Sequence, residues 1–229
     1  MRVIVETGNP VTLLGAGSCS ARDLRRALTM APHLVAADGG ADRALALGHV
    51  PDAVVGDLDS LSAAARARLD AGRLHRIGDQ DSTDFDKCLS VIRAPWILAL
   101  GFTGARLDHT LAGFSTLARF PDRRCIMLGG GDLCFAAPPR LALDLTVGAR
   151  LSLFPMAPVR GGSEGLRWPI AGLAFSPAGV IGTSNEVSAS RVALEFDAPG
   201  MLVMLAARHL KPVLGGLQAA PRWTEGAGC

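Results

Sequence analysis

The sequence predicts an α/β fold, with an N-terminal, mostly parallel (Rossmann-like) α/β domain followed by a C-terminal antiparallel β-sandwich domain. Up to about residue 131, short apolar runs alternate with stretches of helical character, which is the pattern of a parallel sheet with right-handed crossovers. After about residue 138, short apolar runs are broken by Gly, Pro and Ser without helical periodicity. That second pattern is typical of antiparallel strands.

In the first half, each apolar run is expected to be a strand that leads into a helix. Ser20 is placed to cap the first helix, and Gly48 to end the second. The expected strands are 11–15, 33–38, 52–56, 95–101 and 125–131, and the helices that follow the first four lie within 20–30, 41–48, 60–72 and 106–120. We expect three segments: residues 1–136 as the α/β domain, 137–215 as the β-sandwich, and 216–229 as a loosely held tail.

Charge and cysteine content exclude some classes of protein. The net charge is only +2, so the sequence gives no electrostatic case for a nucleic-acid or membrane partner. The five cysteines form no C-x-x-C pair and are odd in number, which favours reduced thiols and a cytoplasmic protein. The first fifteen residues are too short and interrupted for a signal peptide or a membrane span.

Two aspartates, Asp57 and Asp59, follow the expected strand 52–56 directly. Two carboxylates about 4 Å apart repel by roughly 4 kcal/mol at an effective dielectric near 20, so something must offset the repulsion. In extended backbone the two side chains point to the same face and present hard oxygen ligands, which suits Mg²⁺. A hydrated, exposed turn explains the same residues without a metal.

The segment 79–92 predicts a helix that Thr83 and Asp86 cap reciprocally. Its apolar stripe is Phe85, Cys88, Leu89 and Ile92, so Asp84 and Lys87 are expected to project from a flank away from that stripe. The positive end of the helix dipole and the Lys87 charge together suit a phosphate. A well-capped surface helix with an Asp–Lys pair is the alternative.

A similar arrangement recurs at 101–113, where a glycine loop leads into a helix. Leu107, Leu111, Phe114 and Ala118 give the apolar stripe, and Arg106, Asp108 and His109 lie in the first turn. Arg106 suits bidentate recognition of a phosphate. Asp108 is also explained as a cap, and His109 as a hydrogen-bonded structural residue.

Another strand end carries Asp38, Gly39 and Gly40, where the glycines allow close approach of a ligand, although a plain tight turn explains them too. The loops at 13–18 and 128–132 carry weaker signals. We expect these motifs to meet at the ends of the strands, and ligands of parallel sheets bind beyond the carboxyl ends of the strands. Their convergence is more informative than any single motif.

The chain resembles the thiamine pyrophosphokinase (thiamine diphosphokinase) family from about residue 11 to about residue 210. The resemblance lies in five stretches that occur in the family's order: AADGGADRAL, PDAVVGDLDS, DQDSTDFDKCL, GFTGARLDHTLA and TSNEVSASRVALEF. It implies a homodimer with active sites shared between subunits. It also implies transfer of the diphosphoryl unit of ATP to the hydroxyethyl oxygen of thiamine, giving thiamine diphosphate and AMP.

The resemblance implies roles for individual residues. Asp57, Asp59 and Asp84 would hold Mg²⁺, and Lys87 and Arg106 would neutralise the moving phosphates; these five form the implied catalytic set. The implied ATP-binding residues are Asp38, Gly39, Gly40, Thr83, Arg106, Asp108 and His109, and the implied thiamine-binding residues are Gln80, Ser184 and Asn185.

In two respects the chain departs from the family. Some members carry a tryptophan in the last strand that stacks on thiamine, whereas this chain has GMLVML there, so either Trp168 or Trp223 substitutes or the pocket is aliphatic and lined by methionine. The first loop is GAG, where members often have three glycines. Two other functions remain open from the sequence. One is another Mg²⁺-dependent nucleotide or phosphate-ester enzyme, such as a phosphatase in which the first Asp of D-x-D is a nucleophile. The other is a thiamine- or nucleotide-binding protein that has lost catalysis.

Overall fold

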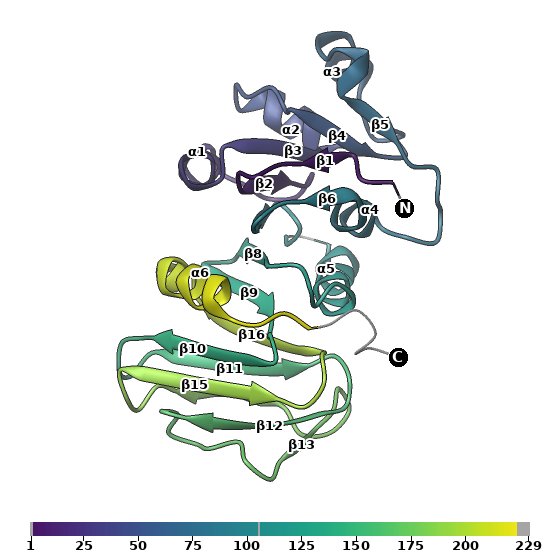
Figure 1. The fold of residues 1–229 in the computed structure, drawn as a ribbon. Helices are drawn as coiled ribbons and strands as arrows, with labels where there is room; N and C mark the ends of the chain where they lie inside the picture. Colours follow the sequence, from purple (N-terminus) through teal and green to yellow (C-terminus); the bar gives the residue numbers. More distant parts are fainter. Residues whose placement is uncertain (1, 105, 224–229) are drawn as a thin grey trace. The chain divides into compact units, whose positions relative to one another are not determined.

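A computed structural model describes residues 2–104 and 106–223, which form two compact units (Figure 1). The first comprises Met1–Thr116 and Met127–Gly130, and the second Leu117–Ile126 and Gly131–Cys229. This division differs from the predicted boundary after residue 136. The chain enters the second unit earlier because β9 (Asp132–Ala136) pairs with an antiparallel strand of that unit.

The first unit contains the predicted parallel sheet. Five strands are parallel throughout, in the order β7-β2-β3-β4-β5, and β8 lies beside β7. A two-stranded parallel pair, β1 with β6, was not predicted. The bounds are β1 (Val5–Glu6), β2 (Val11–Leu14), β3 (His33–Ala37), β4 (Ala53–Gly56), β5 (Leu74–Arg76), β6 (Ile92–Arg93), β7 (Ile97–Leu100) and β8 (Cys125–Gly129).

The helices of this unit begin where the sequence supplies caps. The hydroxyl of Ser20 accepts from the backbone N–H of Asp23, which confirms the predicted cap, and Ser62 caps α3 in the same way. The bounds are α1 (Ala21–Met30), α2 (Gly40–Ala46), α3 (Ala63–Arg68), the 3₁₀ turn η1 (Ala71–Arg73), α4 (Asp84–Val91) and α5 (Leu107–Arg119).

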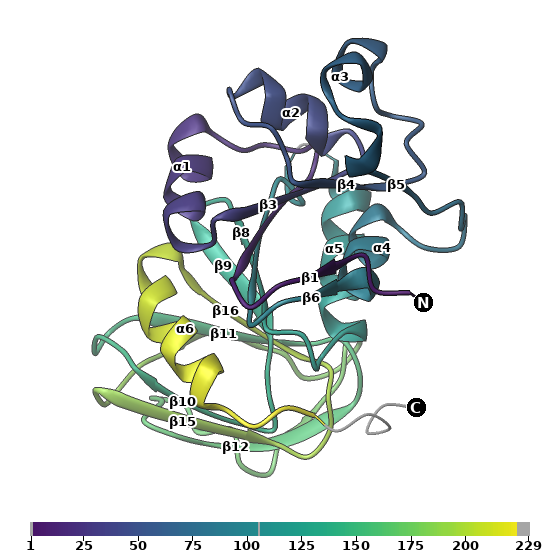
Figure 2. The same cartoon turned by 45° about the horizontal axis from the view of Figure 1, so that its top comes forward.

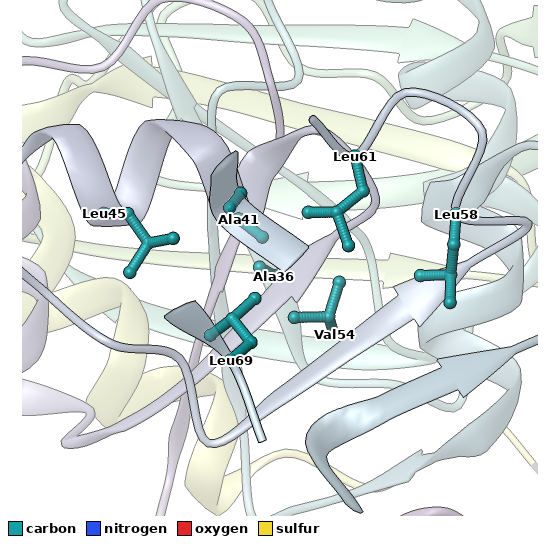
Figure 3. Packing of buried hydrophobic residues seen from close by; sticks show 8 residues of the cluster. Ala36, Ala41, Leu45, Val54, Leu58, Leu61 and Leu69 are labelled. Atoms are coloured by element: carbon teal, nitrogen blue, oxygen red, sulfur yellow. The ribbon is translucent and has the colours of Figure 1, made fainter. Parts of the chain in front are cut away.

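An apolar cluster joins α2 and α3 to the sheet (Figure 3). Ala36 of β3 and Val54 of β4 supply its strand side, and the others come from α2, α3 and their flanking loops: Ala41, Leu45, Leu58, Leu61, Ala65 and Leu69. Figures 1 and 2 show α2 and α3 on one face of β3 and β4, and α4 on the other. The cluster fixes the segment that follows β4, where the aspartate pair lies.

The second unit confirms the predicted antiparallel β-sandwich. One sheet has the order β14-β11-β16-β9 and the other β10-β15-β12-β13. Burial alternates along β15, as expected for a strand with one solvated face. The remaining bounds are β10 (Arg140–Asp144), β11 (Arg150–Pro155), β12 (Val159–Glu164), β13 (Ala174–Phe175), β14 (Gly182–Glu186), β15 (Arg191–Phe196) and β16 (Met201–Ala206).

The predicted loose tail is wrong for residues 216–223. Helix α6 (Leu210–Ala219) follows the 3₁₀ turn η2 (Ala207–His209) and buries four apolar side chains: Leu210, Val213, Leu214 and Leu217. Beyond the helix, the indole of Trp223 donates to the carbonyl of Ala137 at 2.9 Å. Residues 224–229 of the predicted tail lie outside the described residues.

Alanine substitutions at two adjacent glycines of α6 are expected to change the unfolding free energy in opposite directions. A Cβ on Gly216 would lie 2.6 Å from the Ala142 carbonyl oxygen of β10, whereas a Cβ on Gly215 meets nothing within 4 Å. Gly216→Ala should therefore cost about 1–3 kcal/mol of unfolding free energy. Gly215→Ala should gain up to about 1 kcal/mol, because alanine favours helix. Urea unfolding measures both, and equal effects would contradict the packing of α6 on β10.

Protonation of His209 should lower the stability of the fold at mildly acidic pH. His209 is buried and directly precedes α6. Burial, with a smaller contribution from Arg208, lowers the pKa of His209 below its ordinary value. The unfolded chain therefore takes up this proton near pH 6.5, before the folded chain does, and stability is lost as the pH falls below that value. We expect the unfolding free energy, measured with urea, to fall less between pH 7.5 and pH 5.5 in His209→Gln than in the wild type. Parallel pH profiles of the two proteins would contradict this.

Within the described residues, none of the helices is long and apolar enough to cross a membrane. Four cysteines of this part of the chain are free and buried: Cys19, Cys88, Cys125 and Cys134.

Candidate active site

The aspartate pair lies in a tight turn after β4. The backbone N–H of Asp59 donates to Oδ1 of Asp57 at 3.3 Å, and Leu58 between them adopts a left-handed φ of +64°. The prediction of extended backbone here is therefore wrong. The turn, rather than the two-residue period of a strand, brings the carboxylates together.

Gly56 leaves space for two further carboxylates. A Cβ at this position would lie 2.8 Å from Cβ of Asp38 and 3.2 Å from Oδ1 of Asp84. Asp38 follows β3 with a left-handed φ of +41°, and Asp84 begins α4. The predicted convergence of strand ends thus holds for the segments after β3 and β4 and for the start of α4, and the missing side chain of Gly56 allows it.

Asp38, Asp57 and Asp59 form an acidic cluster in which one carboxylate oxygen of each lies within 4.8 Å of the others. Asp38 is buried, its Oδ2 accepts from the Ser60 N–H at 3.2 Å, and its Oδ1 has no hydrogen-bond partner among the described residues. Burial raises the pKa of Asp38, and the charges of Asp84 and Asp57 add to this rise. A buried, unsatisfied carboxylate oxygen beside two other carboxylates fits a hard divalent cation.

Lys87 crosses from α4 to this cluster. Its ammonium donates to Oδ1 of Asp84 at 3.1 Å and to Oδ2 of Asp57 at 3.2 Å. Burial alone lowers the pKa of Lys87, but the two carboxylates outweigh burial and raise it above its ordinary value. Burial acts to raise the pKa of Asp57, and the hydrogen bonds from Asp59 and Lys87 bring it below its usual range. Lys87 is therefore a fixed cation at the site.

The alternative of a surface helix is wrong for Lys87, because only 2% of its side chain is exposed. The predicted capping box is confirmed: Thr83 accepts from the Asp86 N–H, and Asp86 accepts from the Thr83 N–H. This box fixes the first turn of α4. Asp84 is a neighbour of the cluster and a partner of Lys87, so its role as a metal ligand stays a prediction.

A cavity of about 550 Å³ lies within the first unit. Polar groups from the predicted set line it, namely Asp38, Gly39, Thr83, Asp84, Arg106 and His109. Gly40 and Asp108 are outside this lining; Gly40 packs so closely on β2 that a Cβ would meet the Leu14 carbonyl oxygen. The cavity has room for a ligand of nucleotide size.

An aromatic pair in the cavity wall was missed. Phe85 of α4 stacks on Phe102 with ring centroids 4.1 Å apart, and both line the cavity. The sequence assigned Phe85 to the apolar stripe of its helix and gave Phe102 no role. The signal for Phe102 was its place in the glycine loop after a strand.

Arg106 and Asp108 form an exposed bidentate pair, with Nε of Arg106 3.2 Å from Oδ1 of Asp108. The hydrogen bonds from Arg106 hold the pKa of Asp108 down at about 2. The predicted packing of the helical stripe is wrong at its start, because Leu107 is 76% exposed and Leu111 is 65% exposed. The helix begins on the surface beside the cavity mouth.

Two family models match the chain. "Thiamin pyrophosphokinase, catalytic domain" matches residues 24–128, and "Thiamin pyrophosphokinase, vitamin B1 binding domain" matches residues 140–201. Thiamin pyrophosphokinase 1 of Caenorhabditis elegans is 30% identical over 188 residues, which are 73% of this chain and 76% of the relative. The chain belongs to the thiamine pyrophosphokinase family. Thiamine pyrophosphokinase 1 of Oryza sativa subsp. japonica is 29% identical over 198 residues, 72% of this chain and 75% of the relative.

Solved structures share the fold. Thiamin pyrophosphokinase from Candida albicans aligns with a TM-score of 0.73 at 17% identity, over 87% of this chain and 89% of that one. The yeast thiamin pyrophosphokinase aligns with a TM-score of 0.72 at 17% identity, over 93% of this chain and 89% of that one. The family's catalytic-domain model covers the acidic cluster and Lys87, which places these residues in the part of the chain named for catalysis.

The predicted thiamine-binding residues fall in both units. Gln80 is exposed in the loop before α4, whereas Ser184 and Asn185 lie on β14, inside the match to the family's vitamin B1 binding domain. The side-chain amide of Asn185 donates to the Trp168 carbonyl at 2.7 Å and accepts from the Trp168 N–H at 3.2 Å. Asn185 is buried and holds the backbone of Trp168, whose side chain is 53% exposed. Direct contact of Gln80, Ser184 and Asn185 with thiamine stays a prediction.

Proposed function

We propose that this chain is a thiamine pyrophosphokinase, which transfers the diphosphoryl group of ATP to the hydroxyethyl oxygen of thiamine and releases AMP. The observation that supports this most strongly is the acidic cluster with Lys87, beside a nucleotide-sized cavity in the segment that matches the family's catalytic domain. Family membership favours this transferase over the phosphatase and the inactive binding protein. ATP is then a co-substrate.

Mg²⁺ fits the acidic cluster, and Asp38, Asp57 and Asp59 would hold it, with Asp84 beside them. Three convergent carboxylates and the unsatisfied Oδ1 of Asp38 support this assignment. The ion would supply positive charge to phosphate oxygens and so stabilise the charge that develops during transfer. The chain's own part is to keep these carboxylates ionised and oriented, through the Ser60 and Asp59 N–H groups and Lys87.

Transfer of this kind depends on positioning and charge neutralisation more than on covalent chemistry. Lys87 would bring a preorganised cation to the bridging oxygens, because its two carboxylate partners fix it before the substrate arrives. Arg106 would exchange its exposed partner Asp108 for phosphate at the cavity mouth, where His109 also lies. The thiamine oxygen attacks the β-phosphorus, and AMP leaves with the electrons of the broken P–O bond.

The residues that we propose to contact thiamine are Gln80, Ser184 and Asn185. Ser184 and the Trp168 surface that Asn185 holds are the groups of the second unit that this proposal uses. Trp168 is exposed and backbone-anchored, which supports it, rather than half-buried Trp223, as the aromatic substitute for the family's last-strand tryptophan. Arg167 already lies over its ring, 4.9 Å from the centroid.

We also propose a homodimer with shared active sites in the cytoplasm. Leu107 and Leu111 support a second copy here, since two exposed leucines one helical turn apart form an apolar surface beside the cavity mouth. Four free thiols support a reducing compartment. Sedimentation equilibrium should give twice the mass of the 23.8 kDa chain, and Leu111→Glu should lower the dimer fraction; a wild-type monomer at micromolar concentration would exclude the shared site.

The proposed function is tested by the acceptor dependence of AMP release. The protein is incubated with ATP and Mg²⁺, with and without thiamine, and the adenine nucleotides are separated by chromatography. AMP should appear only with thiamine. Production of ADP, thiamine-independent release of phosphate, or no turnover would reject the proposal.

A further inference from the structure

Arg43 of α2 lies at the cavity of the first unit without an assigned role. It lines that cavity and is half-buried. Its Nη2 donates to the carbonyl of Cys19 at 2.6 Å. Its Nε is shielded from solvent and has no hydrogen-bond partner among the described residues.

The cations around the acidic cluster and the cavity differ in how they are neutralised. Lys87 has two carboxylate partners, and Arg106 has Asp108. Arg43 has no carboxylate within 4 Å in residues 2–104 and 106–223. A half-buried charge without a counter-ion is costly, and an anion that enters the cavity offsets the cost.

The bond to Cys19 orients the guanidinium. Cys19 directly follows the loop 15–18, whose four residues line the same cavity. One of the five N–H donors of Arg43 is used by this carbonyl, and the planar group keeps others for an anion. A neutral carbonyl fixes the side chain but leaves its charge uncompensated.

We propose that Arg43 binds a phosphoryl group of the nucleotide in this cavity. The inference rests on the proposed function, since that function brings a nucleotide to the site. It adds to the predicted nucleotide-binding residues a cation that is not already neutralised by the protein.

The test is the equilibrium affinity for ATP in the presence of Mg²⁺, measured by isothermal titration calorimetry without thiamine at about 50 and 300 mM NaCl. Arg43→Met removes the charge, and Arg43→Gln removes it but keeps a donor for the Cys19 carbonyl. Arg93→Met is the matched control, because half-buried Arg93 donates to the Ser90 and Ile92 carbonyls at 3.0 and 3.1 Å and is absent from the cavity lining.

Both Arg43 variants should bind ATP at least about tenfold more weakly, and Arg93→Met within twofold of the wild type. The ATP affinity of the two Arg43 variants should also depend less on the NaCl concentration than that of the wild type, because one charge–phosphate contact is lost. Arg43→Gln serves if Arg43→Met fails to fold. Wild-type affinity in a folded Arg43 variant, or weaker binding with an unchanged salt dependence, would overturn the inference and leave Arg43 a structural clamp. A wild type that binds no ATP would instead reject the proposed function.

Discussion

Replacing Lys87 by methionine is expected to lower kcat by about 100-fold or more, because its ammonium is the cation that the fold holds in place before substrate binds. Stability should fall by about 3 kcal/mol at most. The carboxylates of Asp57 and Asp84 lose their partner, but their side chains are 17% and 35% exposed, so water solvates them in part. Steady-state kinetics and urea unfolding of the same preparation separate the two effects.

Lys211→Met is the control for this experiment, because Lys211 is the only other lysine of the chain and lies exposed on α6. It should leave kcat unchanged. A Lys87→Met enzyme with kcat within tenfold of the wild type would show that Lys87 is a structural partner of the two aspartates and not a catalytic group.

Asp59→Asn should lower the turnover rate by about 100-fold or more, while the fold stays intact. Asp59 is exposed, and among the described residues its carboxylate accepts a hydrogen bond only from the adjacent Ser60 hydroxyl, at 3.0 Å, so its loss costs the structure little. It contributes one carboxylate oxygen to the acidic cluster, which we propose as the Mg²⁺ site. We expect the Mg²⁺ concentration for half-maximal rate to rise in this variant, as measured by titration of the initial rate.

Asp70→Asn is the control, because it removes an exposed carboxylate of the same unit that does not belong to the acidic cluster. Within residues 2–104 and 106–223, the ion-pair partner of Asp70 is Arg73 alone, at 3.6 Å. Asp70→Asn should keep the wild-type rate and Mg²⁺ dependence. If Asp59→Asn reaches near-normal rates at saturating Mg²⁺ without a change in the Mg²⁺ requirement, Asp59 is not part of the metal site.

The sheet of the first unit could be predicted because each buried strand is a continuous apolar run followed by a turn or cap signal. Strands β1, β5 and β6 escaped prediction because they are two or three residues long and partly exposed. Helix α6 was not predicted, and its residues were divided between the β-sandwich (to 215) and the tail (from 216), because Gly215 and Gly216 lower helix propensity. Its helix is stabilised instead by burial of leucine and valine side chains and by the close approach that Gly216 allows.

At the candidate site, the sequence predicted which residues take part but not their conformation and burial. Asp57, Asp59 and Lys87 could be selected from motif spacing, but the left-handed Leu58 and the burial of Lys87 depend on tertiary packing. Periodicity marked Leu107 and Leu111 as an apolar face without saying what covers it. Arg43 was not singled out from the sequence, because its lack of a carboxylate partner among residues 2–104 and 106–223 is visible only once the fold places its neighbours.

The most direct test of the account is the fate of the β-phosphorus of ATP. The protein is incubated with Mg²⁺, thiamine and ATP labelled at the β-phosphorus, and the products are resolved by chromatography. We expect the label to appear in thiamine diphosphate, with one unlabelled AMP formed for each thiamine diphosphate. Label that stays in ADP while thiamine gains a single phosphate, or label released as inorganic phosphate, would contradict it.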